Sequence, residues 1–315
     1  KMRELALILN AARERRGSID FDLPEPILRF DPQGQIVAVT RSERNIAHRI
    51  IEEFMLAANE AVASHLEEAG CDSLFRIHEP PDPRRVMEFE EVAHGLGYSL
   101  GAGATSEISS RLYQKLVAKL EGKPEERILN YLMLRSLKQA RYSPENRGHF
   151  ALAADRYTHF TSPIRRYPDL IVHRVLDAWL DARPAVYSGP ELYAIADESS
   201  DSERRAADAE RELVEWKKVK FMASRLGDHF DALIISAGRW GFFVELEDLF
   251  VEGLVPIETL PADRFRPDPK IGDRVRVQLA RIEPVEHKLQ FTLLQNRGQY
   301  TQSPISRTRR PRRNR

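Results

Sequence analysis

The stretch HFTSPIRRYPDL, residues 159–170, decides how the middle of this chain is interpreted. Two consecutive arginines and a tyrosine stand directly before Pro168, and proline is favoured at the first position of a helix. The free N–H groups at a helix start favour anions, and arginine can grip a phosphate with paired hydrogen bonds. We therefore predict a phosphate site at Arg165 and Arg166. Tyr167, held extended by the proline that follows it, is predicted to stack on a base.

The two arginines also have a purely structural interpretation. Asp155 and Asp169 are near them in the sequence and could pair with either guanidinium group. The residues alone leave the phosphate site and the internal ion pair both open.

Residues 1–226 are predicted to be mostly helical. One helix spans residues 1–16 and ends at Gly17, and two extended segments with a turn at residues 31–34 follow it. A long helix to about residue 69 is predicted to be capped by Thr40 or Ser42. Further helices are predicted at about residues 82–95, 106–122, 123–140, 168–182 and 190–226, the last with alternating charges. The residues expected on the apolar face of the long helix are Ile46, Ile50, Phe54, Ala57, Ala61 and His65.

From Gly227 the hydrophobic period changes to two, which is typical of strands. Short strands at residues 230–237, 241–246, 251–255, 274–282 and 288–293 fit a five-stranded OB-type barrel. Phe242 and Phe243 must face opposite ways, so one joins the core and the other can stack on a base. Arg239 and Trp240 precede them on the same hairpin, and we predict that this cluster binds RNA.

The composition is ordinary for a soluble globular chain, with 42% apolar and 30% charged residues. No apolar run is long enough to span a bilayer, so no membrane partner is expected. Cys71 is the single cysteine, which excludes an intrachain disulfide and favours a reducing cytoplasm. The formal net charge is zero, but residues 297–315 hold seven arginines and no acid. We expect this stretch to be a disordered basic tail that contacts polyanions.

Several segments together resemble one family. The run PENRGHFAL at residues 144–152 and the stretch 159–170, with residues 45–59 and 74–78, resemble the RNase II/RNase R family in order and spacing. Members degrade RNA processively from its 3′ end, releasing nucleoside 5′-monophosphates by Mg²⁺-assisted hydrolysis in an RNB domain. Within the β-rich part, residues 238–244 and 252–256 resemble the S1 RNA-binding domain. The resemblance extends over nearly the whole chain, to Leu294.

The resemblance implies roles for individual residues. Arg165 would be the catalytic arginine that steadies the scissile phosphate and its developing charge. Glu210 would lie near the active-site end of an RNA channel, and Glu52 near a ribose whose 2′-OH distinguishes RNA from DNA. Phe21 would clamp the terminal bases by stacking. From pattern alone, Phe21 could equally be a core residue, and the two glutamates could be solvated helix surface.

The resemblance also implies what this chain lacks. The family's metals are held by an aspartate cluster in an earlier segment, and Asp20, Asp22 and Asp31 do not reproduce it. We therefore expect no metal ligands here and Mg²⁺ bound by residues upstream of Lys1. The expected fold is α+β: the largely helical C-terminal portion of an RNB catalytic domain (1–226), a five-stranded S1-type OB-fold barrel (227–296) and the tail (297–315).

Three functions remain open. The first is exoribonuclease activity of the complete protein, of which this chain, a monomer, would bind single-stranded RNA without cutting it. The second is a non-catalytic RNA-binding protein that uses the channel and the S1 domain to hold RNA. The third is an unrelated hydrolase built on His149, Asp155 and His159, which the spacing supports poorly. The chain opens within a predicted helix at Lys1, so we expect an upstream segment, which favours the first function.

Overall fold

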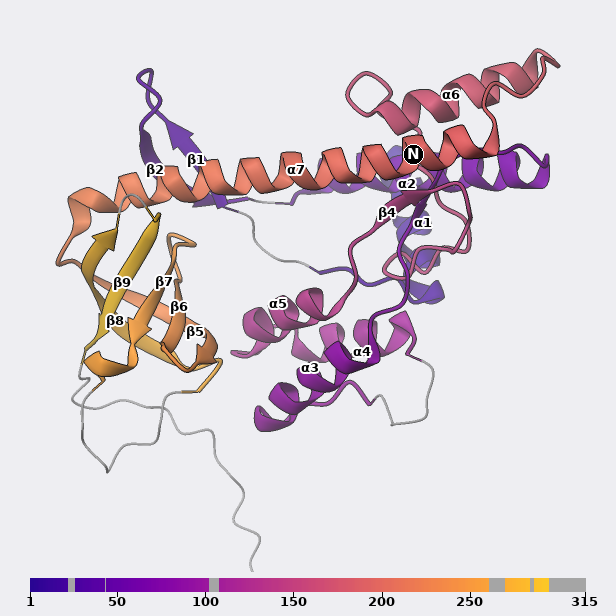
Figure 1. The fold of residues 1–315 in the computed structure, drawn as a ribbon. Coiled ribbons are helices and arrows are strands. Elements are labelled where there is room, and N and C mark those ends of the chain that lie inside the picture. The colour runs from indigo at the N-terminus through magenta and orange to yellow at the C-terminus, as the bar shows by residue number, and fades with distance from the viewer. Residues whose placement is uncertain (22–25, 43, 102–107, 261–269, 284–285, 295–315) are drawn as a thin grey trace, which may run out of the picture.

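The computed structural model describes residues 1–315 except 22–25, 43, 102–107, 261–269, 284–285 and 295–315. The described residues form a helical body and a β-barrel, connected by one long helix, α7 (Gly189–Met222) (Figure 1). The predicted combination of a largely helical part and a C-terminal barrel is therefore confirmed. The predicted basic tail lies outside the described residues.

Two helices and a hairpin open the body. Gly17 ends the first helix in the left-handed conformation (φ 106°), as predicted, and a side chain there would collide with Arg111. The strands of the hairpin pair antiparallel across the predicted turn and form a sheet of their own. These elements are α1 (Met2–Arg16), β1 (Pro26–Phe30), β2 (Ile36–Arg41) and α2 (Ile46–Glu68).

The start of α2 differs from the prediction. Its N-cap is Asn45, whose Oδ1 accepts hydrogen bonds from the N–H groups of Ala47 (2.9 Å) and His48 (3.2 Å). Thr40 instead lies in β2, where its backbone pairs with β1. Several residue types are favoured at an N-cap, but Thr40 is paired within the hairpin and so cannot cap α2.

The buried face of α2 was also predicted wrongly. Ala61, His65 and Ile46 of the predicted apolar face are exposed. Glu53 can lie in the interior because the Arg13 guanidinium of α1 pairs with its carboxylate at 2.7 Å. The side chains of α2 that are buried are Glu53, Asn59, Ala63 and Leu66.

The remaining helices largely follow the predicted pattern. Asp82 stands at the predicted start of α3 and caps it, accepting a hydrogen bond from the Arg84 N–H at 2.8 Å. Ser109 is the N-cap of α4, whereas residue 106, where this helix was predicted to begin, lies outside the described residues. The next helix ends at Ser136 rather than at residue 140. These elements are β3 (Phe75–Ile77), α3 (Pro83–Gly95), α4 (Ser110–Leu120), α5 (Glu126–Ser136), β4 (Arg141–Ser143) and α6 (Tyr167–Leu180).

The C-terminal strands form a closed five-stranded barrel in the order β5-β6-β7-β9-β8, which confirms the predicted OB-type fold. A short 3-10 helix, Ala223–Arg225, leads from α7 into it, and a second, Ile257–Thr259, follows β7. The strands are β5 (His229–Gly238), β6 (Gly241–Leu246), β7 (Glu252–Pro256), β8 (Arg274–Glu283) and β9 (Lys288–Leu293).

One strand of the barrel belongs to two cores. Alternate side chains of β5 face opposite ways, so Ala232 and Ile234 lie in the barrel core. Leu233 and Ile235 lie instead in the main helical core, among residues of α3, α4 and α5. An ion pair between Arg127 of α5 and Glu245 of β6 reinforces this contact.

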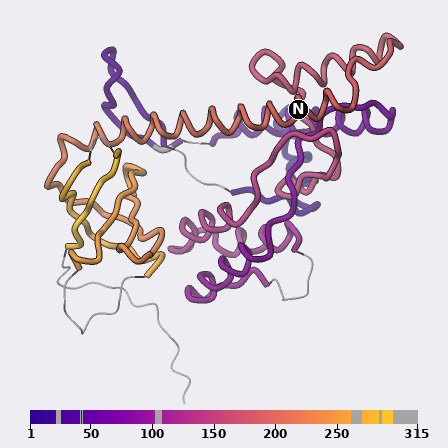
Figure 2. Tube along the Cα trace, viewed as in Figure 1, coloured from indigo at the N-terminus to yellow at the C-terminus, as the bar shows by residue number. Residues whose placement is uncertain are grey.

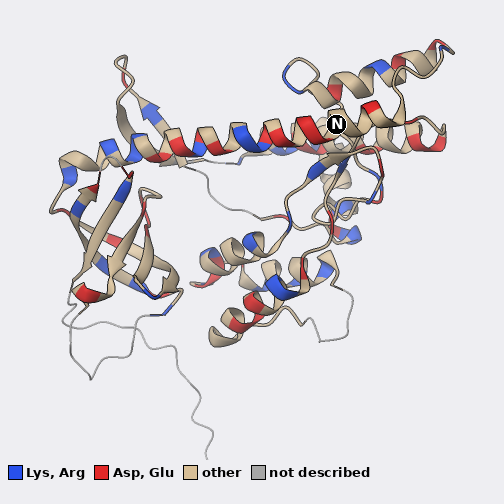
Figure 3. Cartoon of the chain, in the orientation of Figure 1, with Lys and Arg blue, Asp and Glu red and all other residues tan. Residues whose placement is uncertain are grey.

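The helix α7 runs unbroken from the helical body to the barrel (Figure 2). Its 34 residues correspond to about 50 Å of helix. Acidic and basic residues alternate along it (Figure 3), which agrees with the predicted role as a bridge between domains. None of the helices in the described ranges combines the length and apolar character needed to cross a membrane.

Candidate nucleic-acid site

A cleft of about 690 Å³ lies between the start of α6 and residues 195–210 of α7. Four of the residues predicted to contact RNA line it: Arg165, Arg166, Tyr167 and Glu210. Glu210 comes from α7, so the fold brings it to the arginines from a distant part of the sequence. Arg165 is exposed and, among the described residues, forms no ion pair.

The arginine Arg166 is held from inside the protein. Its Nη2 donates to Oδ1 of Asp169 at 2.8 Å, and the same oxygen accepts from the Ser162 N–H at 2.8 Å. Asp169 is 0% exposed. The two interpretations left open by the sequence therefore divide between the arginines: Arg166 has the internal ion pair, and Arg165 faces the cleft.

The loop before the arginines is fixed from two helices. Asn59 of α2 accepts a hydrogen bond from the Phe160 N–H at 3.0 Å through its Oδ1. His173 of α6 bonds to the Phe160 carbonyl at 2.9 Å, and the two rings stack with centroids 4.1 Å apart. A loop fastened in this way presents its arginines in one geometry before any ligand arrives.

Two aromatic groups beneath the cleft are kept uncharged. A 2.9 Å hydrogen bond joins the Tyr142 hydroxyl to Nδ1 of His159. Burial, followed by the charge of Arg166, lowers the pKa of His159 to about 2. Burial raises the pKa of Tyr142 to about 12. At neutral pH both side chains are therefore uncharged, and their hydrogen bond joins β4 to the loop that precedes the arginines.

The alternative hydrolase site is not assembled. Burial, followed by the nearby His78, lowers the pKa of His149 to about 3, so its imidazole is neutral. Within the described part of the chain, no hydrogen bond joins the carboxylate of Asp155 to His149 or His159. A general base oriented by a carboxylate is therefore absent from this group of described residues.

A second hollow of about 450 Å³ adjoins the cleft, and Arg166 lines both. Glu52 lines this second hollow. Its carboxylate is held by Arg44 at 2.6 Å, and Arg44 also binds Asp20 at 2.8 Å. The predicted ribose-contacting glutamate therefore lies close to the arginine cleft with its orientation set by Arg44.

Phe21 takes a different position from the other predicted residues. It is partly buried and packs against the core formed by α3, α4 and α5. This is the core interpretation that the sequence left open. Its role in clamping bases stays a prediction.

The barrel presents its own aromatic cluster. Trp240 and Phe243 are exposed, and the Arg239 guanidinium lies 4.6 Å from the centroid of the Trp240 ring. Phe242 packs against the barrel core. The structure therefore decides between the two phenylalanines: Phe243 is the one available for stacking.

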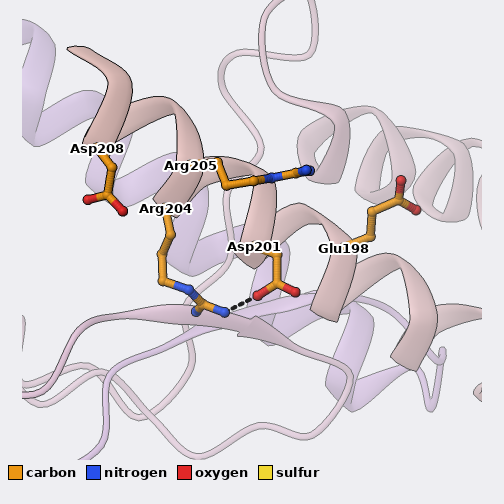
Figure 4. Close-up of a pocket in the computed structure, with 5 residues that line it drawn as sticks. All are labelled: Glu198, Asp201, Arg204, Arg205 and Asp208. Carbon is orange, nitrogen blue, oxygen red and sulfur yellow. Dashed lines mark hydrogen bonds and ion pairs between the residues drawn. The ribbon is translucent and has the colours of Figure 1, made fainter. Parts of the chain in front are cut away.

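A third hollow, of about 640 Å³, lies on α7 beside the cleft (Figure 4). Arg204 turns toward Asp201 and pairs with it, while Arg205 points away from this pair (Figure 4). Three acids and two arginines line the hollow: Glu198, Asp201, Asp208, Arg204 and Arg205. Such balanced charge does not favour a phosphate.

Sequence reasoning missed Asn59 and Tyr142. Asn59 is a buried amide within a helix, and a buried amide needs a hydrogen-bond partner. A polar residue among the inward-facing positions of α2 was therefore the signal that could have pointed to a contact outside this helix. Tyr142 lies on the short strand β4, and nothing local in the sequence connects it with the cleft.

The described residues do not fit a magnesium site. No group of three or more His, Cys, Asp or Glu side chains among them is placed to hold a metal ion. Glu203 and Glu210 both line the cleft, but Glu203 is paired with Arg76 at 2.6 Å. Mg²⁺ prefers several oxygen ligands in near-octahedral geometry, which this arrangement does not offer.

The class that this fold and cleft define is an RNB domain followed by an S1 barrel. Residues 1–182 match the RNB domain family and residues 224–293 the S1 RNA binding domain. The chain belongs to the RNB domain family, which confirms the resemblance found in the sequence.

Individual relatives carry the name ribonuclease R. That of Aquifex aeolicus is 41% identical over 310 residues, covering 93% of this chain and 44% of the relative. That of Escherichia coli is 37% identical over 319 residues, covering 93% of this chain and 39% of the relative. The chain thus spans less than half the length of these relatives.

Solved structures of Mycoplasma genitalium RNase R have the same fold. The form without RNA has a TM-score of 0.87 at 26% identity, covering 93% of this chain and 49% of the other. The complex of that protein with ribose-methylated single-stranded RNA has a TM-score of 0.86 at the same identity and coverage. Yeast Ssd1, described as a pseudonuclease, shares the fold at 24% identity with a TM-score of 0.59, covering 70% of this chain and 28% of the other.

Proposed function

We propose that the complete protein is a processive 3′→5′ exoribonuclease that hydrolyses single-stranded RNA to nucleoside 5′-monophosphates. The observation that carries the proposal is the cleft in which Arg165 stands exposed beside Arg166, Tyr167 and Glu210. Membership of the RNB family and the ribonuclease R relatives support it.

Each cleft residue suits a step of RNA hydrolysis. A planar guanidinium such as that of Arg165 offers paired donors to a phosphate and stabilises negative charge that develops on it. The ion pair with Asp169 keeps Arg166 at the edge of both hollows. Tyr167 offers a face for a base, and Glu210 offers an acceptor for a ribose hydroxyl.

The proposed activity requires Mg²⁺, whose ligands we assign to another segment of the protein. The family resemblance implies a bound Mg²⁺ that polarises the phosphate and activates a water. Since the described residues do not fit such a site, we place its ligands in another segment of the protein. The isolated chain should then bind RNA and leave it intact.

The proposal extends to the organisation and location of the protein. We divide the chain into the RNB portion (1–226), the S1 barrel (227–296) and the basic tail (297–315). The exposed aromatic cluster at Arg239, Trp240 and Phe243 would bind single-stranded RNA. A single cysteine supports a cytoplasmic location, and we infer a monomer.

The test uses the purified chain, Mg²⁺ and a 5′-labelled single-stranded RNA, with binding and product length followed together. Arg165→Ala should weaken binding several-fold. The matched control is Arg183→Ala, because Arg183 is an exposed arginine after α6 that pairs with Asp177 and Asp181 outside the cleft.

Each result has a clear meaning. Intact RNA with salt-dependent affinity that falls only in Arg165→Ala supports the proposal. Stepwise shortening of RNA by the chain alone, lost in Arg165→Ala, would show that the metal ligands lie within these residues. Absence of any RNA binding would overturn the proposal.

A further inference from the structure

The barrel-proximal half of α7 carries a second cluster of aromatic and basic side chains. Phe30 of β1 is 50% exposed and Trp216 of α7 is 39% exposed. The Lys217 Nζ lies 5.6 Å from the Phe30 ring centroid and 5.3 Å from the Trp216 ring centroid. Lys220 Nζ lies 5.8 Å from the same tryptophan ring. We call Phe30, Trp216, Lys217 and Lys220 the aromatic platform.

A hydrogen bond holds the platform together. Lys217 Nζ donates to the carbonyl of Gly34, in the turn of the β1–β2 hairpin, at 2.7 Å. The hairpin is a two-stranded sheet of its own, and such a sheet is marginally stable unless something supports it. Lys217 thereby joins the hairpin to α7, and its ammonium group lies close to both the Phe30 ring and the Trp216 ring. Two of the three ammonium donors remain available to a ligand.

The charge of the platform is not neutralised. Glu215 precedes Trp216, but Lys218 binds its carboxylate at 2.9 Å. Among the described residues, neither Lys217 nor Lys220 forms an ion pair. Two cations interleaved with exposed rings match the pattern of a single-stranded nucleic-acid surface, where bases stack and phosphates meet cations.

The helical repeat places the platform in phase with the cleft. Eighteen residues make five turns of an α-helix, so positions eighteen apart share one face and lie about 27 Å from each other. The figures show α7 without a break between the helical body and the barrel (Figures 1 and 2). Three cleft-lining residues are matched in this way; the pairs are Glu198 with Trp216, Ser199 with Lys217, and Ser202 with Lys220.

We propose that the aromatic platform is a second RNA contact, which holds the strand on the face of α7 outside the cleft. Bases would stack on Trp216 and Phe30, while Lys217 and Lys220 contact phosphates. This inference rests on the proposed function, since it names a further site for the same ligand. At ~3.4 Å per stacked nucleotide, the ~27 Å between Glu198 in the cleft and Trp216 in the platform corresponds to about 8 nucleotides. A strand of about 4 nucleotides bound at the Glu198 end of the cleft should therefore not reach the platform.

The experiment compares RNA lengths. The affinity of the full chain is measured by fluorescence anisotropy for labelled single strands of about 4 and about 16 nucleotides, on either side of the span estimated from the stacked rise. Trp216→Ala should weaken binding of the longer strand about tenfold and leave the shorter one unchanged. Trp216→Phe, which keeps an aromatic face, should retain most of the affinity.

Lys220→Ala tests the charge contribution, because Lys220 is exposed and, unlike Lys217, does not hold the hairpin on α7. It should lower the slope of log affinity against log salt by about 0.7 for the longer strand. Arg211→Ala is the matched control, because Arg211 is an exposed cation of α7 that lies about 180° around the helix from Lys220. It should change neither the affinity nor the slope.

The outcomes separate the two proposals. Unchanged binding of the longer strand in Trp216→Ala, or an equal loss at both lengths, would overturn the platform and leave the cleft intact. In that case the aromatic platform would bind a protein segment and not RNA. Failure of the unaltered chain to bind either strand would overturn the proposed function itself.

Discussion

Replacing Asp169 tests how the arginine loop is held. One oxygen of this carboxylate, which is 0% exposed, accepts from both Ser162 N–H and Arg166 Nη2 at 2.8 Å. Asp169→Ala leaves the Arg166 guanidinium without its counter-charge and the Ser162 amide without its acceptor. Removing one partner of a buried ion pair costs ~3–5 kcal/mol. Because the Arg166 side chain is still 21% exposed, we expect the lower end, about 3 kcal/mol of unfolding free energy.

The assay is urea unfolding followed by circular dichroism, with RNA affinity measured on the variants that remain folded. Asp169→Asn keeps the shape and one acceptor but not the charge, so we expect a loss of about 1.5 kcal/mol. Asp177→Ala is the control, because Asp177 lies on the same helix and pairs with Arg183, but its side chain is 71% exposed. An exposed pair should contribute less than ~1 kcal/mol.

Two results would refute this reasoning. If Asp169→Ala lowered stability no more than Asp177→Ala, the buried pair would not hold the loop. If it lowered stability but left RNA affinity unchanged, the position of Arg166 would not matter for binding.

Three further predictions concern other parts of the molecule. Phe243→Ala should weaken RNA binding about tenfold at an unchanged melting temperature, whereas Phe242→Ala should lower barrel stability by ~2 kcal/mol; the opposite pattern in anisotropy and thermal melts would reverse their assignment. Glu53→Ala should cost ~3–5 kcal/mol in urea unfolding, whereas Glu53→Leu combined with Arg13→Met should be nearly neutral; equal losses would contradict the pairing. Below pH ~6.5 the unfolded chain protonates an imidazole that stays neutral in the folded protein, where the pKa of His159 is about 2, so His159 alone should lower the unfolding free energy by ~1.4 kcal/mol per pH unit, in addition to the similar contribution of His149. His159→Gln should reduce the slope by ~1.4 kcal/mol per pH unit between about pH 6 and 4 and leave the contribution of His149, and an unchanged slope would mean that the His159 imidazole is not kept neutral.

Local pattern predicted most of the backbone. The period of two after Gly227 and the charged run of α7 are long and regular, so both elements were predicted close to their observed bounds. The prediction of the buried face of α2 was wrong for a non-local reason. Glu53 is buried because Arg13, forty residues earlier, supplies its counter-charge, and hydrophobic periodicity cannot register such a partner.

The site was predictable only where its residues are contiguous. Arg165, Arg166 and Tyr167 form one run before a helix, and physical chemistry alone indicated an anion site there. Glu210 was predicted only through the family resemblance. It lies on α7, far from the arginines in the sequence, so sequence spacing could not indicate that it lines the same cleft. Tyr142 joins from a third element and was missed.

The strand β5 has a consequence for how this protein can be divided. If the barrel were excised from the chain, Leu233 and Ile235 would lose their contacts with the helical core and become exposed to water. Fully burying such a side chain is worth ~1.5–3 kcal/mol, and whole domains are stable by only ~5–15 kcal/mol. The excised barrel would therefore expose apolar side chains that favour aggregation. A barrel grafted from another protein would in turn leave apolar residues of α5 exposed to water. In this chain the S1 unit is an integral part of the architecture and not an interchangeable accessory.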